Sequence, residues 1–405
     1  MRITIVLILL SLGLFSCTEK ETPPLSFSLV NKLEVARQDA GFTVAGELFQ
    51  SILKEVNGHQ FRIQSEESNV NYQLEDMDDD GKNDQLFLID DFAPEQQKSY
   101  VIVVLPEMEA DFNPGGTKRT NIHFATVHNP TAIINSAQRL TNEDTLVSTY
   151  YQMEGPAWEN DKVAFRNYFD QRNGIDIFGK RTSKMTLQNV GLPGGNYHEL
   201  ADWGMDILKV GSSLGAGAIA IEKKDELYRV TGAPSSYQLI LEGSLRSMFL
   251  LSFDRIEVGG DFLGVRHLIT ICAGKQYYES HVDLKGLMGS EKLAAGIVNL
   301  HSDTLYEVGS AVYTFDKQAE DGAHLGMGLY CPTDYFIEKG QTPNEGEGIT
   351  SSYFMKMAID KENGNDFYFI TGWETQDQNF KERTFFEQKL KEIAEELGSP
   401  IELIK

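Results

Sequence analysis

Short runs of apolar residues with a β-type pattern recur along the chain from about residue 25. In the first quarter they occupy residues 61–64, 85–89 and 99–105, and turn-forming residues bound each run. Runs of this length that are rich in β-branched and aromatic residues are typical of strands. We therefore predict a small N-terminal β domain that, with a connecting region around Pro114-Gly115-Gly116, extends over residues 25–150.

The same pattern resumes near residue 163 and continues to about residue 370. Its clearest runs are at 218–221, 227–230, 237–241, 248–253 and 312–315, with glycine-rich turns between them. Such close spacing favours antiparallel sheets over alternating strands and helices. The predicted fold is therefore mainly β, with a large antiparallel β-sandwich over residues 151–405.

One helix is predicted, near the C-terminus. Between Lys381 and Leu397 the apolar residues recur at helical spacing, and Gly398 followed by Pro400 supplies a stop.

The first residues have the pattern of an export signal. Arg2 precedes an apolar stretch over residues 3–15, which is shorter than the about 20 residues that a membrane span needs. The segment Leu14-Phe15-Ser16-Cys17 resembles a bacterial lipobox. We expect a lipoprotein signal peptide over residues 1–16, lipidation of Cys17 and a tether over residues 17–24, and hence a lipid-anchored protein of the cell envelope. The alternative is an ordinary secretory signal with an incidental cysteine.

Charge narrows the range of partners. The formal net charge is −24, from 60 acidic and 36 basic residues. Nucleic acid is therefore not expected as a partner, because phosphate binding needs a basic surface. Adsorption to anionic lipid is disfavoured for the same reason, which leaves the anchor as the expected membrane contact. The remaining cysteines, Cys272 and Cys331, could pair, but a buried free thiol is an equal alternative for Cys272.

Acidic residues alternate in the segment 76–84. Asp76, Asp78, Asp80 and Asp84, with Gly81 for a sharp turn, have the oxygen ligands and spacing that suit calcium. The glutamate and exiting helix of an EF-hand are missing. The segment therefore predicts either a structural calcium site or a plain acidic hairpin.

Basic residues gather between residues 162 and 184. This segment contains six basic residues and only two acidic ones. The basic residues are Lys162, Arg166, Arg172, Lys180, Arg181 and Lys184, and the acidic ones are Asp170 and Asp176. This local excess suggests an anionic ligand such as a uronate or a sulfate group. On a strand, Arg166 and Tyr168 would share a face that looks into a cleft or solvent, and Trp158 could stack on a sugar ring. The alternative is that these cations only pair with surrounding carboxylates.

A glycine-rich block over residues 194–217 contains the other candidate chemistry. Its His198 is either a proton-transfer group or a structural histidine. Motifs for nucleotide loops, esterase elbows and HExxH metalloproteases are absent from the sequence. Glycines in this number suggest a backbone wrapped closely around a site.

Several of these segments together resemble a known family. The segments 158–166, 174–181, 197–217 and 242–249, with Gly372-Trp373, resemble the family called domain of unknown function 4861. Members are typically encoded among polysaccharide-degradation genes, and one branch is described as an oligosaccharide dehydratase of ulvan breakdown. The resemblance implies a galactose-mutarotase-like β-supersandwich. It also implies elimination of water from a non-reducing-end uronic acid, which gives a 4,5-unsaturated sugar.

That reaction needs a base for the C5 proton, an acid for the leaving O4 and cations beside the carboxylate. We assign His198 as base, Tyr197 or Tyr168 as acid, and Arg166 with Lys180 or Arg181 as the carboxylate clamp. Further expected substrate contacts are Trp158, Lys162, Asp206 and Arg246. No cofactor is expected for catalysis. Tyr197 and His198 would point to opposite faces of a strand, so both can act only if Gly194-Gly195 places them in a turn.

Two other classes of function compete with this interpretation. A non-catalytic glycan-binding lipoprotein would use Trp158 and the basic face for binding alone. A glycoside hydrolase would need paired carboxylates, for which Glu159, Asp161, Asp176 and Asp206 are available.

Overall fold

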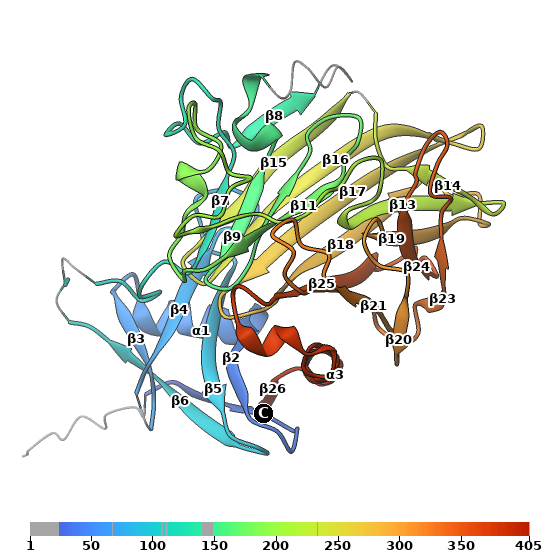
Figure 1. The fold of residues 1–405 in the computed structure, drawn as a ribbon. Helices are drawn as coiled ribbons and strands as arrows, with labels where there is room; N and C mark the ends of the chain where they lie inside the picture. Colours follow the sequence, from blue (N-terminus) through green and yellow to red (C-terminus); the bar gives the residue numbers. More distant parts are fainter. Residues whose placement is uncertain are drawn as a thin grey trace, which may run out of the picture.

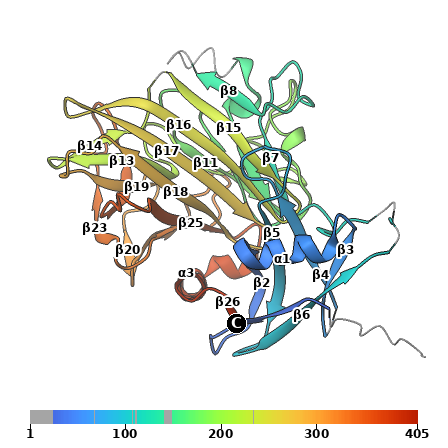
Figure 2. The ribbon, with the colours of Figure 1, turned by 180° about the vertical axis from the view of Figure 1, so that it is seen from behind.

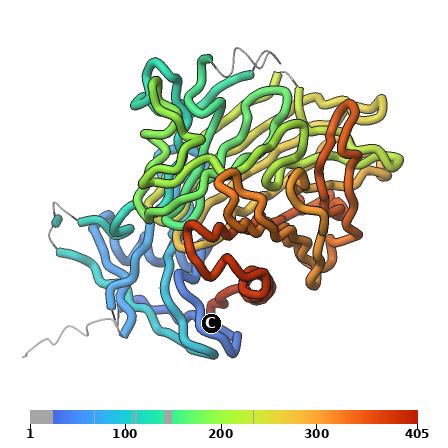
Figure 3. The backbone as a smooth tube through the Cα atoms, viewed as in Figure 1, coloured from blue at the N-terminus to red at the C-terminus, as the bar shows by residue number. Residues whose placement is uncertain are grey.

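The computed structural model describes residues 24–66, 68–106, 108–109, 112–139, 149–232 and 234–404. The expected signal peptide, Cys17 and all but the last residue of the tether lie outside the described residues. Within these ranges the chain forms four antiparallel sheets, seen as a smaller and a larger body in Figure 1 and as a continuous path in Figure 3.

The smaller body is a seven-stranded sheet with one helix. Its strand order is β2-β5-β4-β3-β6-β1-β26. The strands are β1 (Ser26–Val30), β2 (Arg37–Val44), β3 (Phe61–Ser65), β4 (Asn69–Glu75), β5 (Gln85–Phe92), β6 (Gln97–Val104) and β26 (Glu402–Ile404). Helix α1 (Gly46–Val56) crosses the sheet, as seen from behind in Figure 2. It buries Phe49, Ile52 and Val56. This helix was not predicted from the sequence, because three turns give only a short stretch of helical spacing.

The larger body has a nine-stranded sheet in the order β20-β21-β22-β25-β18-β17-β16-β15-β8. Its strands are β8 (Ser136–Arg139), β15 (Ser235–Glu242), β16 (Arg246–Val258), β17 (Asp261–Cys272), β18 (Tyr277–Lys285), β20 (Tyr306–Val308), β21 (Ala311–Asp316), β22 (Leu325–Tyr330) and β25 (Asn365–Trp373).

Two five-stranded sheets face the nine-stranded one. The first has the order β12-β11-β10-β9-β7 and the second β14-β13-β19-β24-β23. The strands of the first are β7 (Thr120–His123), β9 (Ala157–Asn160), β10 (Ala164–Asn167), β11 (Ile175–Lys180) and β12 (Gly204–Asp206). Those of the second are β13 (Ala216–Lys223), β14 (Glu226–Arg229), β19 (Lys292–Val298), β23 (Phe336–Gln341) and β24 (Ser352–Met357). A parallel bridge between Ile175 and Gly215 joins the two.

The main hydrophobic core fills the space between these layers. It takes alternate residues from both sides, for example Phe165 and Ile177 from one layer and Phe249 and Ile269 from the other. The expected mainly β, antiparallel supersandwich is therefore confirmed, and hydrophobic alternation along the strands is its cause.

The predicted C-terminal helix is also confirmed. Helix α3 (Arg383–Gly398) buries Phe386 and Leu390 against β21 and β22. After it the chain returns to the smaller body, where Ser28 of β1 pairs with Ile404 of β26. Strand pairing thus does not divide at residue 150. β7 and β8 precede that residue but belong to sheets of the larger body, and β26 follows it but belongs to the smaller sheet. Separate domains divided at residue 150 stay a prediction.

Two further features concern membranes and thiols. Among the described residues no helix is both long and apolar enough to cross a bilayer.

Cys272 and Cys331 are both free thiols. Burial raises the pKa of each to about 12, so neither is a reactive thiolate near neutral pH.

Candidate active site

Strands β10 and β11 place the charged candidates on one face of their sheet. Arg166 pairs with Asp176 and Ala164 with Phe178 in the register of the two strands. The alternate residues, including Phe165, point into the main core. The predicted division into an apolar and a polar face is therefore correct, and it follows from the two-residue period of a strand.

That polar face is covered and does not meet solvent. Leu187, Val190 and the partly buried Tyr197 and Trp203 pack over it, against a set of small and aromatic residues formed by Ala157, Ala164 and Phe178. The side-chain amide of Gln152 fastens this cover by donating to the carbonyl of Val190 at 2.5 Å. Arg166 and Lys180 are consequently only 2% and 1% exposed. The expectation that Arg166 and Tyr168 look into a cleft or solvent is wrong, because a segment without a regular pattern covers them.

Arg166 is the centre of a buried cluster. Its guanidinium donates to Asp176 Oδ2 at 2.8 Å, to Asp206 Oδ2 at 3.3 Å and to the hydroxyls of Tyr168 and Tyr197 at 2.5 and 3.3 Å. Four of the predicted site residues are thus brought together by one cation. A buried guanidinium with these partners is fully paired, so it cannot also act as a free clamp.

Burial sets the protonation of the cluster. Loss of solvent, followed by the neighbouring charge of Asp176, raises the pKa of Asp206 well above its usual range. Burial also raises the pKa of Tyr168, whose hydroxyl donates to Asp176 Oδ2 at 2.8 Å. Tyr168 therefore stays protonated, and its proton is already committed to a carboxylate.

Tyr197 and His198 lie in a turn, which resolves the conflict between them. Their rings are 4.4 Å apart, so they lie on the same side of the backbone. Asn196 shapes the turn, because its side-chain oxygen accepts from the backbone N–H of His198 at 3.1 Å. His198 Nδ1 lies 3.4 Å from Asp206 Oδ2, and the side chain is 63% exposed. A buried charge network is therefore connected to an exposed imidazole.

A strained turn brings a further carboxylate to the rim of the cluster. Met153 and Glu154 have φ values of 55° and 63°, a left-handed conformation that non-glycine residues seldom adopt. Glu154 thereby reaches two arginines, with Oε1 3.5 Å from Arg166 Nη1 and Oε2 2.8 Å from Arg172 Nη2. The guanidinium of Arg172 also lies 3.7 Å from the centre of the Tyr168 ring. Glu154 was not among the predicted site residues, and only Gly155-Pro156 after it hinted at a special backbone.

Lys162, Lys180 and Arg181 form a different region. They line one cleft of about 470 Å³ together with Gln376 and Gln378. Within the described residues no hydrogen bond or ion pair joins their side chains to the Arg166 cluster. Lys180 is bound to the buried Glu159 and to the carbonyl of Asn160 at 2.7 Å. The expected partnership of Arg166 with Lys180 or Arg181 around one carboxylate is therefore wrong.

Trp158 belongs to the core. It is fully buried, with its ring 5.2 Å from Phe249, 5.3 Å from Tyr278 and 5.7 Å from Phe165. It has no free face for a sugar, because position 158 points inward on β9. The expectation of sugar stacking on Trp158 is wrong.

Arg246 has a structural place between the two bodies. Its Nε donates to Glu75 at 3.0 Å and its Nη1 to Thr43 at 3.1 Å, both in the smaller sheet. The guanidinium lies 4.1 Å from the centre of the Phe87 ring. Arg246 therefore does not join the Arg166 cluster.

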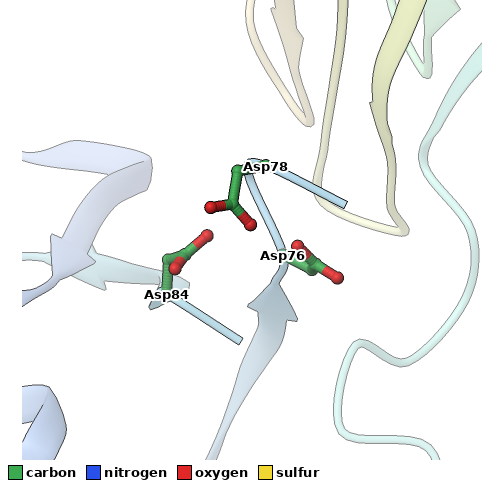
Figure 4. Close-up of side chains that lie close together, drawn as sticks. All are labelled: Asp76, Asp78 and Asp84. Atoms are coloured by element: carbon green, nitrogen blue, oxygen red, sulfur yellow. The ribbon is translucent and has the colours of Figure 1, made fainter. Parts of the chain in front are cut away.

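The acidic loop holds three carboxylates close together. One oxygen each of Asp76, Asp78 and Asp84 lies within 4.8 Å of the others, and Figure 4 shows the group. Calcium ligands lie about 2.4 Å from the ion, so this spacing fits three ligands of one calcium. Asp80 stands apart, because its Oδ2 pairs with Lys82 at 2.9 Å. Asp76 also accepts from the backbone of Gly81 at 2.8 Å, as in an acidic turn.

Comparison with known proteins assigns the chain to a family. The model for the family described as "Domain of unknown function (DUF4861)" matches residues 29–403. The chain is similar to an "Uncharacterized protein P7" of Formosa agariphila, with 25% identity over 281 residues that cover 61% of this chain and 66% of that protein. Two solved Enterococcus faecalis structures each align with 94% of this chain at a TM-score of 0.45 and 8% identity. They are a protein of glycosyl hydrolase family 38 and an α-mannosidase, of which this chain spans 47% and 45%. The family match extends over nearly all of the sequence, and the chain belongs to the DUF4861 family.

Proposed function

We propose that the protein is a carbon–oxygen lyase that removes water from the non-reducing-end uronic acid of an ulvan-like oligosaccharide. One observation carries the proposal: the exposed His198 contacts Asp206, a member of the buried Arg166 cluster, at 3.4 Å. Proton abstraction beside a carboxylate needs an accessible base with a hydrogen-bonding partner that orients it. No other histidine in the described residues combines strong exposure with a contact to a buried carboxylate.

His198 acts as the base. With Nδ1–H directed at Asp206, Nε2 has its lone pair free to take the C5 proton of the uronate. The C5–H bond electrons form the C4–C5 double bond as the C4–O4 bond breaks. O4 leaves as water after it gains one proton from the acid.

Tyr197 is the acid that the geometry favours. Its hydroxyl lies 3.3 Å from Arg166 Nη1, so the guanidinium stabilises the phenolate that remains after proton transfer. Tyr168 is nearly buried, and its proton is bound to Asp176. Tyr168 therefore serves as a positioning residue for Arg166.

The substrate carboxylate is expected at Arg172, because the guanidinium of Arg166 is fully paired. Glu154 Oε2 lies 2.8 Å from Arg172 Nη2, so a carboxylate is already accommodated at this rim of the cluster. Arg172 is 29% exposed and is the more accessible of the two. A uronate that displaces Glu154, or binds beside it, would gain charge-assisted hydrogen bonds from Arg172.

The rival functions lose their candidate residues. The carboxylates named for a hydrolase are all engaged: Glu159 by Lys180, Asp161 by Arg119, and Asp176 and Asp206 by Arg166. A hydrolase would need two of them free to flank a glycosidic bond. A pure binding protein loses the aromatic platform proposed for it, because Trp158 is buried.

Absorbance tests the proposal. Incubation with a uronate-ended oligosaccharide should produce the ultraviolet absorbance of a C4–C5 double bond conjugated with the uronate carboxylate. An oligosaccharide with a neutral sugar at the same end is the matched control and should give no signal. New reducing ends without that absorbance would instead indicate hydrolysis and contradict the lyase.

We also propose the lipid anchor that the N-terminal sequence predicts. Cys17→Ala should release the protein from the membrane fraction, because the diacyl chains make attachment stable. A variant that stays in the membrane fraction would contradict the lipobox.

A structural calcium at Asp76, Asp78 and Asp84 is a further proposal. Calcium should raise the melting temperature of the chain, because an ion that binds only the folded form stabilises it. Asp78→Asn should reduce that shift, with Asp80→Asn as the control outside the group. An unchanged melting temperature after calcium addition would contradict the calcium site and support the alternative of a plain acidic hairpin.

A further inference from the structure

A second polar pocket lies where the two bodies meet helix α3. Its volume is about 380 Å³, within the range of small-molecule sites. Its walls come from β2 and β5 of the smaller sheet, from β16, β17, β18 and β25 of the larger sheet, and from the end of α3. Figure 2 shows α3 between β25 and the strands β2 and β26. No residue of the Arg166 cluster lines this pocket.

One wall is a row of polar side chains on the outer face of the nine-stranded sheet. Glu279 of β18 stands opposite Tyr368 of β25, and Tyr277 precedes Glu279 by two residues. The three side chains therefore share a face. Tyr278 points the other way, into the core, where its hydroxyl donates to the carbonyl of Ala216 at 2.6 Å. A strand that buries one face so completely has placed two phenols and a carboxyl on the other.

These polar groups lack partners. Among the described residues, the carboxyl of Glu279 and the hydroxyls of Tyr277 and Tyr368 have no hydrogen-bond partner. Nε of Arg37, another wall residue, is buried and also has none. Buried polar groups are normally hydrogen-bonded, so the unpaired Nε of Arg37 indicates a ligand that supplies the missing bond. Glu279, Tyr277 and Tyr368 are half-buried and leave further hydrogen bonds open to the same ligand.

The cations of the wall are already engaged. Arg246 is paired with Glu75, Lys275 donates to the carbonyl of Gln38 at 3.2 Å, and Arg37 donates to the carbonyl of Ser399. No unpaired cation of the described wall residues therefore remains to recognise an anion. Burial raises the pKa of Glu279 to about 7, so near neutral pH this carboxyl can either donate or accept. Sugar hydroxyls have the same double capacity and match phenols and a carboxyl of this kind.

We propose that this pocket binds one neutral monosaccharide unit through Glu279, Tyr277 and Tyr368. The site is separate from the Arg166 cluster and does not depend on the lyase proposal. It would hold a sugar ring by hydrogen bonds alone, which predicts weak binding in the millimolar range.

Titration followed by saturation-transfer NMR tests the pocket. The probes are the methyl glycosides of glucose, galactose, mannose, xylose and rhamnose, each at up to about 50 mM, well above the expected dissociation constant. At least one should bind saturably to the full chain. Tyr368→Phe removes one hydroxyl and should weaken that binding about five- to tenfold. Tyr330→Phe is the matched control, since Tyr330 neighbours Tyr368 at 6.0 Å between rings but does not line the pocket.

Glu279→Leu provides a second variant, and melting curves establish that each variant is folded. Weaker binding in either variant, with Tyr330→Phe unchanged, supports the site. Failure of all five glycosides to bind, or equal affinity in both pocket variants and wild type, would overturn it. His198→Ala should bind the glycoside normally even where it loses turnover, so failure of this site and failure of the lyase proposal are distinguishable.

Discussion

Two ion-paired groups lie on the same face of the first five-stranded sheet, and they differ in whether they contact an exposed base. Lys180 and Glu159 are both buried, and backbone groups together with the side chains of Asn121 and Thr186 supply their remaining hydrogen bonds. Arg166 and its carboxylates are equally buried, yet their network continues to His198, which is 63% exposed. Both groups consist of charged residues that the sequence analysis singled out. The second connects a carboxylate directly to an exposed imidazole, whereas the first reaches the exposed Lys118 only through Asn121. Direct contact with an exposed base is what distinguishes a candidate active site from a structural ion pair.

The largest effect is expected at the exposed end of the Arg166 cluster. His198→Ala should lower turnover by about 10²–10⁴-fold, because general base catalysis supplies a factor of this size. Substrate affinity and melting temperature should change little, since the side chain is mostly in solvent. Turnover and thermal melting on the same preparation check this, and a stable variant with normal turnover would remove His198 from the mechanism.

The buried pair of Lys180 and Glu159 should respond in the opposite way. Lys180→Met leaves Glu159 buried without its cation and should lower the free energy of unfolding by about 3–5 kcal/mol. Lys162→Ala, an exposed lysine of the same cleft, is the control and should change it by less than about 0.5 kcal/mol. Denaturant unfolding measures both. If Lys180→Met were as stable as wild type but inactive, the contrast between the two groups would fail.

The two tyrosines sharpen the contrast within the Arg166 cluster. Tyr197→Phe should lower turnover about 10²-fold, because the proton for O4 is lost. Tyr168→Phe should chiefly cost stability, about 1–3 kcal/mol, because a buried partner of Arg166 and Asp176 disappears. Turnover per folded molecule decides between them. The reverse order of effects on turnover would restore Tyr168 as the acid.

Much of this arrangement could be predicted from the sequence, and the limits have physical causes. Alternation along 163–169 placed Phe165 in the core and Arg166 on the other face, because the period of a strand is local information. Burial of that other face depends on a cover around residues 187–203, which has no regular period. Glu154 was missed for a similar reason, since a strained turn leaves little trace in composition.

One aromatic residue was also misplaced. Trp158 was expected at a ligand because it neighbours charged residues, but β9 directs it inward. The smaller sheet was recognised in part. Its last strand comes from residues 402–404, far away in sequence, and no local pattern predicts that this segment pairs with β1.

The smallest effect concerns pH and Asp206. Its pKa is raised in the folded chain above the ordinary value of 3.8, so the folded form binds the proton more tightly than the unfolded form. Its contribution to stability is therefore fully present below about pH 3.8 and is lost as pH rises through the folded-state pKa. Asp206→Asn cannot titrate and should flatten this part of the stability curve. Urea unfolding between about pH 4 and pH 8 measures the slope, and an unchanged slope in the variant would contradict the assignment.

The central claim is that the Arg166 cluster removes the C5 proton of a uronate through His198. An oligosaccharide whose terminal uronate carries deuterium at C5 tests this most directly. We predict an unsaturated product that has lost one water and all of that deuterium, formed by wild type and not by His198→Ala at equal folded concentration. A shorter product that retains the deuterium would show that the bond broken is glycosidic, and would contradict elimination through His198.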